Sequence, residues 1–338
     1  MLQQPPQHRD GRRRALALVV TADDLGYGEE RDRGIFQLWE SKEEEEGAEE
    51  KGGGPFISGA SLLCNGRTAE EAVKRALSCG LPLNLHLNLT EGAPLCPPGL
   101  VPSLCDSSGE MLGKFGFRKA LAEGHVSLSE VEQEVRAQLA WFKQRYFTPL
   151  LHKLASSSTA LVKGMHVDGH QHVHVLPQLV PLLASLFKEY NVLSTRLPNE
   201  DLSNCSWMPQ GPQRTFLEEV SSQAESAKAI YASSSIHSTD AFLGLSLMGS
   251  NSTAEHIFSR LDSIISSYSS GPSSPPRHIE WMVHPGYKST AYGDDFSRSE
   301  EREHEMRILS SPELRSGLLI RSLHLISFPD FMHHLQQE

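Results

Sequence analysis

The segment over residues 165–177 places four histidines and one aspartate at every second position. These residues are His166, Asp168, His170, His172 and His174. Because successive side chains of a β-strand point to opposite faces, this spacing predicts a strand with imidazoles along one face. Several neutral imidazoles buried in one place need several partners, and one divalent cation can satisfy that need. The segment therefore indicates a metal site.

One ion cannot bind all five side chains, because same-face residues lie about 6.6 Å apart along a strand. We expect one or two ligands from this segment, with the other side chains supporting the ligands or contacting a substrate. A set of two histidines and one carboxylate leaves coordination positions open for water and substrate, which favours a catalytic site over a structural one. The same set is also found in iron-dependent oxygenases, so iron chemistry remains an alternative.

Polar residues also accompany three other predicted strands. Asp23 and Asp24 follow an apolar run over 15–21, His86 lies in a segment of alternating polarity, and His284 follows a further buried run. Reactive groups in parallel α/β folds gather at the carboxyl ends of the strands, so these side chains are candidates for one common site. Taken singly, the aspartates could instead cap a helix, and each histidine could be structural.

Strands and helices alternate along the chain, and this order predicts a parallel sheet that is closed or nearly closed into a barrel. The predicted strands cover residues 15–21, 56–64, 82–92, 165–175, 192–198, 242–245 and 278–287. The predicted helices cover residues 28–40, 68–80, 128–146, 177–190 and 254–268. The expected fold class is therefore α/β, with parallel strands in a barrel-like (β/α) arrangement.

The chain is expected to form one catalytic domain over residues 15–335. Residues 1–14 are polar and basic, a composition typical of a disordered segment. Residues 41–54 contain a run of glutamates and end in glycines, which indicates a solvated acidic loop insertion.

The composition argues against several classes of partner. Lysine and arginine number 31 and aspartate and glutamate 42, a formal charge of −11, which disfavours nucleic acid and anionic membrane surfaces. No apolar run approaches the roughly 20 residues of a membrane-spanning helix, and no signal peptide is evident. The five cysteines include no C-x-x-C pair, so we expect reduced thiols and a cytoplasmic protein.

Three ordered motifs carry a resemblance to a known family. TADDLGYG (21–28), NLHLNLTEG (84–92) and HVDGHQHVHVLP (166–177) resemble the corresponding motifs of the YdjC-like carbohydrate deacetylases, which include chito-oligosaccharide deacetylase. The similarity extends from about residue 15 to SFPDF (327–331). It implies a fold related to the polysaccharide deacetylases and hydrolysis of the acetyl group from N-acetylated sugars.

The resemblance also implies roles for individual residues. Asp24, His86 and His170 would hold a divalent metal, and Asp23 would be the general base that takes a proton from metal-bound water. The family points to Mg²⁺, whereas imidazole ligands suit Zn²⁺, Mn²⁺ or Co²⁺ better. His284 is the candidate general acid, because imidazole titrates near neutral pH.

Several expectations concern the surroundings of these residues. Arg196 could bind substrate or orient Asp23, and His172 and His174 are candidate substrate contacts. The long connection over 149–163 could displace the end of the following strand and, with it, His170. A non-catalytic sugar-binding protein on the same fold remains an alternative, and an exposed barrel face could support a homodimer.

Overall fold

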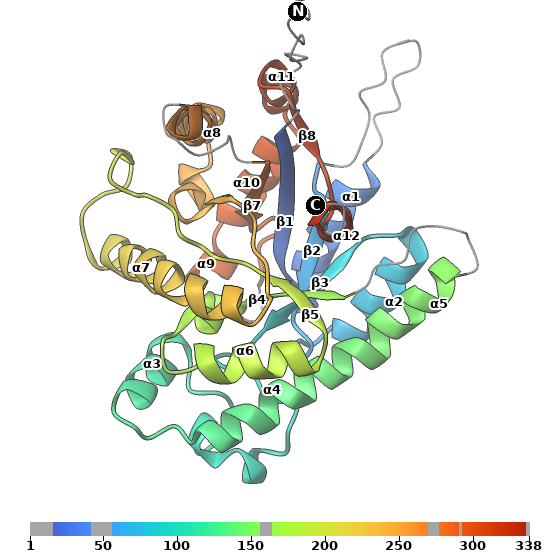
Figure 1. Ribbon diagram of the computed structural model, residues 1–338, viewed down its shortest axis with the longest axis vertical. Coiled ribbons are helices and arrows are strands. Elements are labelled where there is room, and N and C mark those ends of the chain that lie inside the picture. Colours follow the sequence, from blue (N-terminus) through green and yellow to red (C-terminus); the bar gives the residue numbers. More distant parts are fainter. Residues whose placement is uncertain (1–15, 42–55, 156–163, 270–276, 291–292, 336–338) are drawn as a thin grey trace, which may run out of the picture.

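A curved parallel sheet lies at the centre of the protein, with helices packed around it (Figure 1). The computed structural model describes residues 16–41, 56–155, 164–269, 277–290 and 293–335. The predictions for the basic segment 1–14 and for the acidic insertion therefore lie outside the described residues, apart from Ser41.

Eight strands of the described chain form this sheet, and every pair of neighbouring strands is parallel. They are β1 (Leu16–Leu25), β2 (Gly59–Leu62), β3 (Leu83–Leu87), β4 (Met165–Gly169), β5 (Val192–Thr195), β6 (Ala241–Leu243), β7 (His278–Val283) and β8 (Leu323–Leu325). Their order is β5-β4-β3-β2-β1-β7-β6, and β8 pairs with the start of β1. The strand β8 was not predicted, and it is short, with two of its three residues exposed.

The two edges of the sheet meet at one point. The backbone N–H of His237, shortly before β6, donates to the carbonyl of Leu193 at 2.9 Å, and the N–H of Thr195 donates to the carbonyl of His237 at 2.8 Å. These bonds form an isolated parallel bridge between His237 and Ser194 of β5. The sheet is thus curled into a barrel-like α/β fold, which confirms the predicted fold class.

The helices connect successive strands and cover the outside of the sheet (Figure 1). They are α1 (Glu29–Glu40), α2 (Ala69–Cys79), α3 (Lys114–Ala122), α4 (Leu128–Phe142), α5 (Thr148–Ala155), α6 (Val180–Glu189), α7 (Pro212–Ser233), α8 (Ala254–Ser269), α9 (Asp295–Arg298), α10 (Glu301–Leu309), α11 (Pro312–Ile320) and α12 (Phe328–Leu335). The five predicted helices correspond to α1, α2, α4, α6 and α8. Within the described ranges, no helix has both the length and the apolar character needed to cross a membrane.

The strand β1 is buried on both of its faces, as its continuous apolar run predicts. Leu18 and Val20 belong to the main hydrophobic core. Ala17 and Val19 point to the other face, where they pack with Phe328 of α12 and its neighbours. The polar residues discussed below extend from this second face.

The predicted strand over 165–175 is wrong beyond Gly169. Its last residue paired with β3 is Gly169, and a 3₁₀ turn (His170–Val175) follows. Gln171 and His172 adopt left-handed backbone conformations, with φ of 50° and 61°. Because the chain leaves the sheet here, His170, His172 and the later residues of the segment do not share one strand face.

Gly34 allows α1 to approach the loop that follows β7. A Cβ atom at Gly34 would lie 2.6 Å from the Cα of Gly286 and 2.8 Å from the Sδ of Met306. We expect Gly34→Ala to lower the free energy of unfolding by about 1–3 kcal/mol, because one of the packed elements must shift. Urea unfolding of both proteins measures this difference.

Gly116→Ala is the matched control, because Gly116 lies in α3 and a Cβ there would meet only Leu112 at 3.4 Å. It should leave stability unchanged or raise it by up to about 1 kcal/mol through helix propensity. Equal unfolding midpoints for the two variants would contradict the close packing of α1.

Candidate metal and catalytic site

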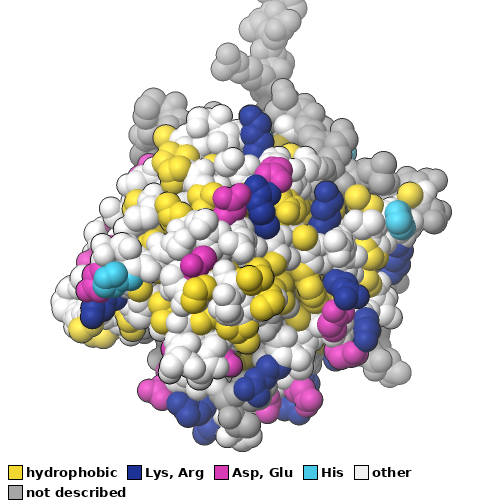
Figure 2. Space-filling model, turned by 90° about the horizontal axis from the view of Figure 1, so that it is seen from below, with side chains coloured by type: hydrophobic (Ala, Val, Ile, Leu, Met, Phe, Trp, Pro, Cys, Tyr) yellow, Lys and Arg dark blue, Asp and Glu magenta, His cyan; other side chains and the backbone are white. Residues whose placement is uncertain are grey.

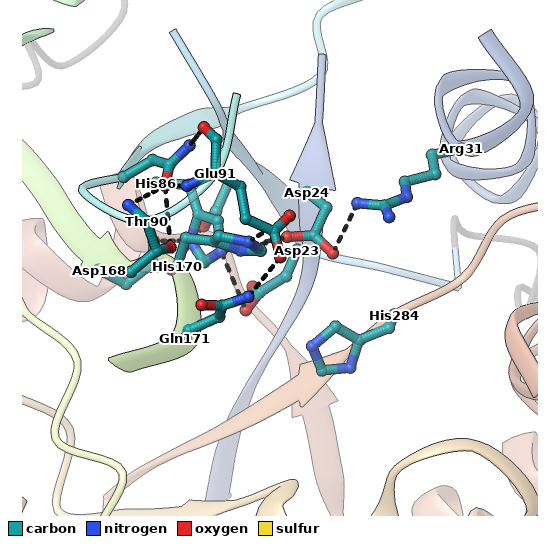
Figure 3. A network of polar contacts seen from close by, with 12 residues as sticks. Asp23, Asp24, Arg31, His86, Thr90, Glu91, Asp168, His170, Gln171 and His284 are labelled. Atoms are coloured by element: carbon teal, nitrogen blue, oxygen red, sulfur yellow. Dashed lines mark hydrogen bonds and ion pairs between the residues drawn. The ribbon is translucent and has the colours of Figure 1, made fainter. Parts of the chain in front are cut away.

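The three predicted metal ligands converge at the carboxyl ends of their strands (Figure 3). Asp24 Oδ1 lies 2.9 Å from His170 Nδ1 and 3.4 Å from His86 Nε2. All three side chains are buried, and their ligand atoms lie within 4.8 Å of one another. The connection before β4 therefore does not displace His170. Part of that connection forms α5, and residues 156–163 lie outside the described residues.

A β-bulge brings both aspartates of β1 into the same site. Between Ala22 and Leu25 the register with β2 shifts, and Asp24 adopts a left-handed φ of 69°. In a regular strand, adjacent side chains would point to opposite faces. Here His86 Nε2 lies 3.8 Å from Asp23 Oδ2 and 3.4 Å from Asp24 Oδ1. Aspartate is one of the few residues that tolerates this backbone conformation.

Each of the two candidate histidine ligands has a second carboxylate on its far nitrogen. His86 Nδ1 lies 2.7 Å from Asp168 Oδ1, and the two residues are paired in the register of β3 and β4. His170 Nε2 lies 3.3 Å from Glu91 Oε2. A carboxylate that accepts the far N–H fixes the tautomer and leaves the near nitrogen free to bind a cation. Glu91 was not predicted, although it belongs to the NLHLNLTEG motif.

The carboxylates outweigh burial in setting the charge of both histidines. Burial lowers the pKa of His86, but Asp168 and Asp23 raise it to about 10. Burial also lowers the pKa of His170, and Asp24 and Glu91 reverse that effect, so the net shift is upward. The carboxylates beside the two histidines therefore stabilise positive charge there, whether protons or a bound cation.

Arg196 holds Asp23 in place from inside the barrel. Its guanidinium donates to both carboxylate oxygens of Asp23, at 2.6 and 2.8 Å, and it also contacts Glu280 at 2.6 Å and Asp168 at 2.9 Å. Burial is the largest influence on the pKa of Asp23 and raises it, Arg196 opposes this effect, and the net shift is upward. Arg196 was predicted either to bind substrate or to orient Asp23, and these hydrogen bonds are the contact that the second role requires.

The three predicted substrate contacts, Arg196, His172 and His174, are all buried. Arg196 and His174 are both 0% exposed, and His174 Nε2 lies 3.0 Å from the carbonyl oxygen of Arg196. The Tyr231 hydroxyl donates to the carbonyl of His174 at 2.5 Å. His172 is 7% exposed and lies in the turn after β4. Arg196 and His174 therefore lie in the interior, and their roles as substrate contacts stay predictions.

The helix α10 supports the other side of the site, and it was not predicted. Arg302 Nη2 donates to Asp24 Oδ2 at 2.6 Å, and Arg31 Nη1 lies 3.2 Å from the same oxygen. The backbone N–H of His284 donates to Glu305 Oε2 at 2.6 Å. The polar sequence of α10 lacks the apolar periodicity by which a helix is recognised, so local pattern offered no signal.

The pKa shifts of Asp24 and His284 have different causes. Burial raises the pKa of Asp24, but His170, Arg31 and Arg302 together lower it well below the usual value. Burial lowers the pKa of His284 to about 3, so this imidazole is neutral at pH 7 in the free protein. The predicted role of His284 as a general acid needs the protonated imidazole.

The part of the chain that the structure describes contains two more groups that could hold an ion. These groups are Asp23–His86–Asp168 and His166–Asp168–Glu280. Arg196 already lies against Asp23, Asp168 and Glu280 and compensates their charge. In the third group, Arg31 and Arg302 contact Oδ2 of Asp24, whereas Oδ1 faces His86 and His170. The group of Asp24, His86 and His170 therefore fits a divalent cation best.

The chain is similar to known proteins over most of its length. The family described as YdjC-like protein matches residues 17–152 and 157–319. A carbohydrate deacetylase of Mus musculus is 37% identical over 93% of this chain and 94% of its own length, and that of Homo sapiens is 36% identical over 93% and 91%. A chitooligosaccharide deacetylase of Serratia marcescens is 31% identical over 59% of this chain and 66% of its own.

One solved structure has a similar fold over almost the whole length of both chains. It is a protein of Enterococcus faecalis V583, described provisionally as a cellobiose-phosphate cleavage protein. The TM-score is 0.64 at 21% sequence identity, covering 94% of this chain and 99% of the other. At this identity the similarity establishes the fold alone.

Proposed function

Because the chain belongs to the YdjC-like protein family, we propose that it is a metal-dependent deacetylase of N-acetylated carbohydrates. The observation that carries this proposal is the convergence of Asp24, His86 and His170 beside a second buried carboxylate, Asp23. Relatives named carbohydrate deacetylase align with more than nine-tenths of the chain, which supports the same chemistry.

The proposed metal ligands are Asp24 Oδ1, His86 Nε2 and His170 Nδ1. Two imidazoles and one carboxylate suit a borderline or hard divalent cation and leave positions open for water and the substrate carbonyl. A bound cation would polarise the amide carbonyl and acidify water. Family resemblance favours Mg²⁺, and the nitrogen donors favour Zn²⁺, Mn²⁺ or Co²⁺, so the ion must be identified by experiment.

Asp23 is the proposed general base. Arg196 binds both of its oxygens and so restricts the carboxylate to one orientation. The pKa of Asp23 is raised toward neutral pH, and a carboxylate with a higher pKa is a stronger base. In this role Asp23 takes the proton of the water that attacks the acetyl carbonyl.

His284 is the proposed donor of the proton that the departing amine needs. Its ring faces the site from the end of β7, across from Asp24 (Figure 3). With a pKa of about 3, His284 is neutral at pH 7, so it must take from solvent the proton that it gives to the amine, and Asp23 returns the proton of the attacking water to solvent afterwards. Negative charge that develops on the substrate oxygen raises the pKa of a neighbouring imidazole and so favours this protonation.

Acetate release tests the proposed function directly. The purified protein is incubated with N-acetylglucosamine and its β-1,4 oligomers, and acetate and free amine are both quantified. We expect both products in equal amounts. Protein that holds metal and binds these sugars, yet releases no acetate from any of them, would favour a non-catalytic sugar-binding protein.

Metal removal gives a further prediction. Inductively coupled plasma analysis should find one divalent ion per chain, and a chelator should abolish acetate release until a divalent ion is added back. Because the ion binds the folded state, its addition should raise the thermal midpoint of the stripped protein. His170→Ala should weaken metal affinity by at least about 100-fold, since it removes one of three protein donors.

His172→Ala is the matched control for this variant. It removes an imidazole from the same turn, but His172 is not in the proposed ligand set. Equal metal affinity in the two variants would show that the ligands have been assigned wrongly.

A further inference from the structure

We propose that the groove between α3 and α7 is a second sugar subsite, which binds a pyranose ring of an oligosaccharide substrate next to the ring that is deacetylated. This inference rests on the proposed function and extends it to a substrate of at least two sugar residues.

The groove has the size and lining of a small-molecule site. Its volume is about 580 Å³, within the range of about 300–1,000 Å³ that is usual for such sites. Its lining combines apolar side chains with a smaller number of hydrogen-bonding groups. The residues that matter here are Phe115, Leu176, Phe216, Arg118, Glu219 and Gln223.

Two aromatic side chains give the groove its apolar surface. Phe115 is 67% exposed, and its ring lies 5.9 Å from that of Phe216 at an interplanar angle of 77°. The Lys114 ammonium lies 3.8 Å from the centroid of the Phe216 ring. Hydrophobic side chains gather on the face seen from below in Figure 2, the side on which α3 and α4 lie in Figure 1.

This lining matches the chemistry of a pyranose ring. One face of such a ring presents C–H groups, which can pack on an exposed aromatic ring and remove apolar surface from water. Its edge presents hydroxyl groups, which can exchange hydrogen bonds with Arg118, Glu219 and Gln223. Without a ligand these three side chains bond to one another: Arg118 donates to Gln223 at 3.3 Å, and Gln223 donates to Glu219 at 2.7 Å. Neither a purely apolar ligand nor a free anion would use both parts of the lining.

Hydrogen bonds connect the groove to the proposed metal site. The N–H of Gly113, at the start of α3, donates to the carbonyl of Thr90 at 2.7 Å. Arg118 Nη2 donates to the carbonyl of Gln171 at 3.0 Å, and Gln171 Nε2 donates to Glu91 Oε1 at 2.5 Å. Glu91 in turn contacts His170. Arg118, which lines the groove, is thus linked to His170 through Gln171 and Glu91. A neighbouring ring of the same oligosaccharide is the occupant that this connection favours.

Phe115→Ala tests the subsite, because a side chain this exposed can be removed with little effect on folding. Dissociation constants for N-acetylglucosamine and its trimer are measured by calorimetry, and kcat/KM by acetate release. We expect Phe115→Ala to weaken trimer binding by roughly ten-fold, because the packing surface is lost, and to leave monomer binding unchanged. Phe115→Trp should restore tight binding of the trimer.

Leu319→Ala is the control, since it removes a 65% exposed side chain from α11. Trimer binding at wild-type strength in Phe115→Ala, or an equal loss for monomer and trimer, would overturn the subsite. Binding that depends on Phe115 without any acetate release would support the subsite and refute the proposed hydrolysis. Acetate release that does not depend on Phe115 would support the proposed hydrolysis and refute the subsite.

Discussion

Asp23→Asn is expected to lower kcat for acetate release by about 10²–10⁴-fold, because an amide cannot accept the proton of the attacking water. The change preserves the size of the side chain and leaves Arg196 its contacts with Asp168 and Glu280. Metal content should remain at the wild-type level, since Asp23 is not one of the three proposed ligands. The measurement is kcat and KM with an N-acetylglucosamine oligomer, together with metal analysis of the same sample.

Asp24→Asn is the matched comparison in the neighbouring position. It changes a proposed ligand, so metal content and activity should fall together. If Asp23→Asn loses activity but keeps its metal, and Asp24→Asn loses both, then Asp23 acts as the base and Asp24 as a metal ligand. Asp23→Asn protein that retains wild-type kcat would exclude Asp23 as the base, and an iron oxygenase would not release acetate in either protein.

Arg196→Met is expected to lower the free energy of unfolding by about 3–5 kcal/mol, because it leaves buried carboxylates without their cation. The carboxylates concerned are Asp23, Asp168 and Glu280, and all of them are at most 1% exposed. Urea unfolding followed by circular dichroism measures the difference. A loss below about 1 kcal/mol would show that Arg196 contributes no more than a surface ion pair.

The loss in Arg196→Met should grow with pH. Burial, only partly opposed by Arg196, raises the pKa of Glu280 to about 7 in the folded protein. A carboxyl group with a raised pKa stabilises the fold at pH values below its unfolded pKa of about 4.3, and this contribution is lost as the pH rises through its folded pKa. Removal of Arg196 raises the folded pKa further. The difference between variant and wild type should therefore be larger at pH 8 than at pH 5.

Arg136→Met is the control for this prediction. Arg136 is also an arginine with two carboxylate partners, Glu132 and Glu189, but these contacts are 36–53% exposed. Solvent screens such pairs, so the expected loss is much smaller than in Arg196→Met and depends little on pH in this range. The contrast between the two arginines isolates the effect of burial.

Much of the scaffold could be predicted from local pattern. The continuous apolar run before Asp23 predicted a strand buried on both faces, and the alternation around His86 predicted another. Alternating strands and helices then predicted a parallel, barrel-like sheet. The helices α3, α5, α7, α9, α10, α11 and α12 were missed, and of these α7, α10 and α11 have only a weak apolar stripe.

The site could be predicted as a set of residue types and not as a geometry. Histidine and aspartate donors at strand ends predicted a cation, and Asp24, His86 and His170 do converge. The histidine segment was interpreted as one strand face, whereas the chain turns after Gly169 and brings only His170 to the ligand group. Alternation describes a strand only as long as a neighbouring strand continues to pair with it.

The sequence by itself determined the chemistry that is available: the donor types, the strand ends that carry them, and the order of elements that makes the sheet parallel. The tertiary structure alone decided how these groups are used. The bulge that turns Asp24 toward His86 depends on the pairing of β1 with β2. The contacts of Arg196 with Asp23 and of Arg302 with Asp24 join residues that are far apart in the chain. Local periodicity reports only on near neighbours along the chain, whereas these contacts exist because the curled sheet brings distant strands together.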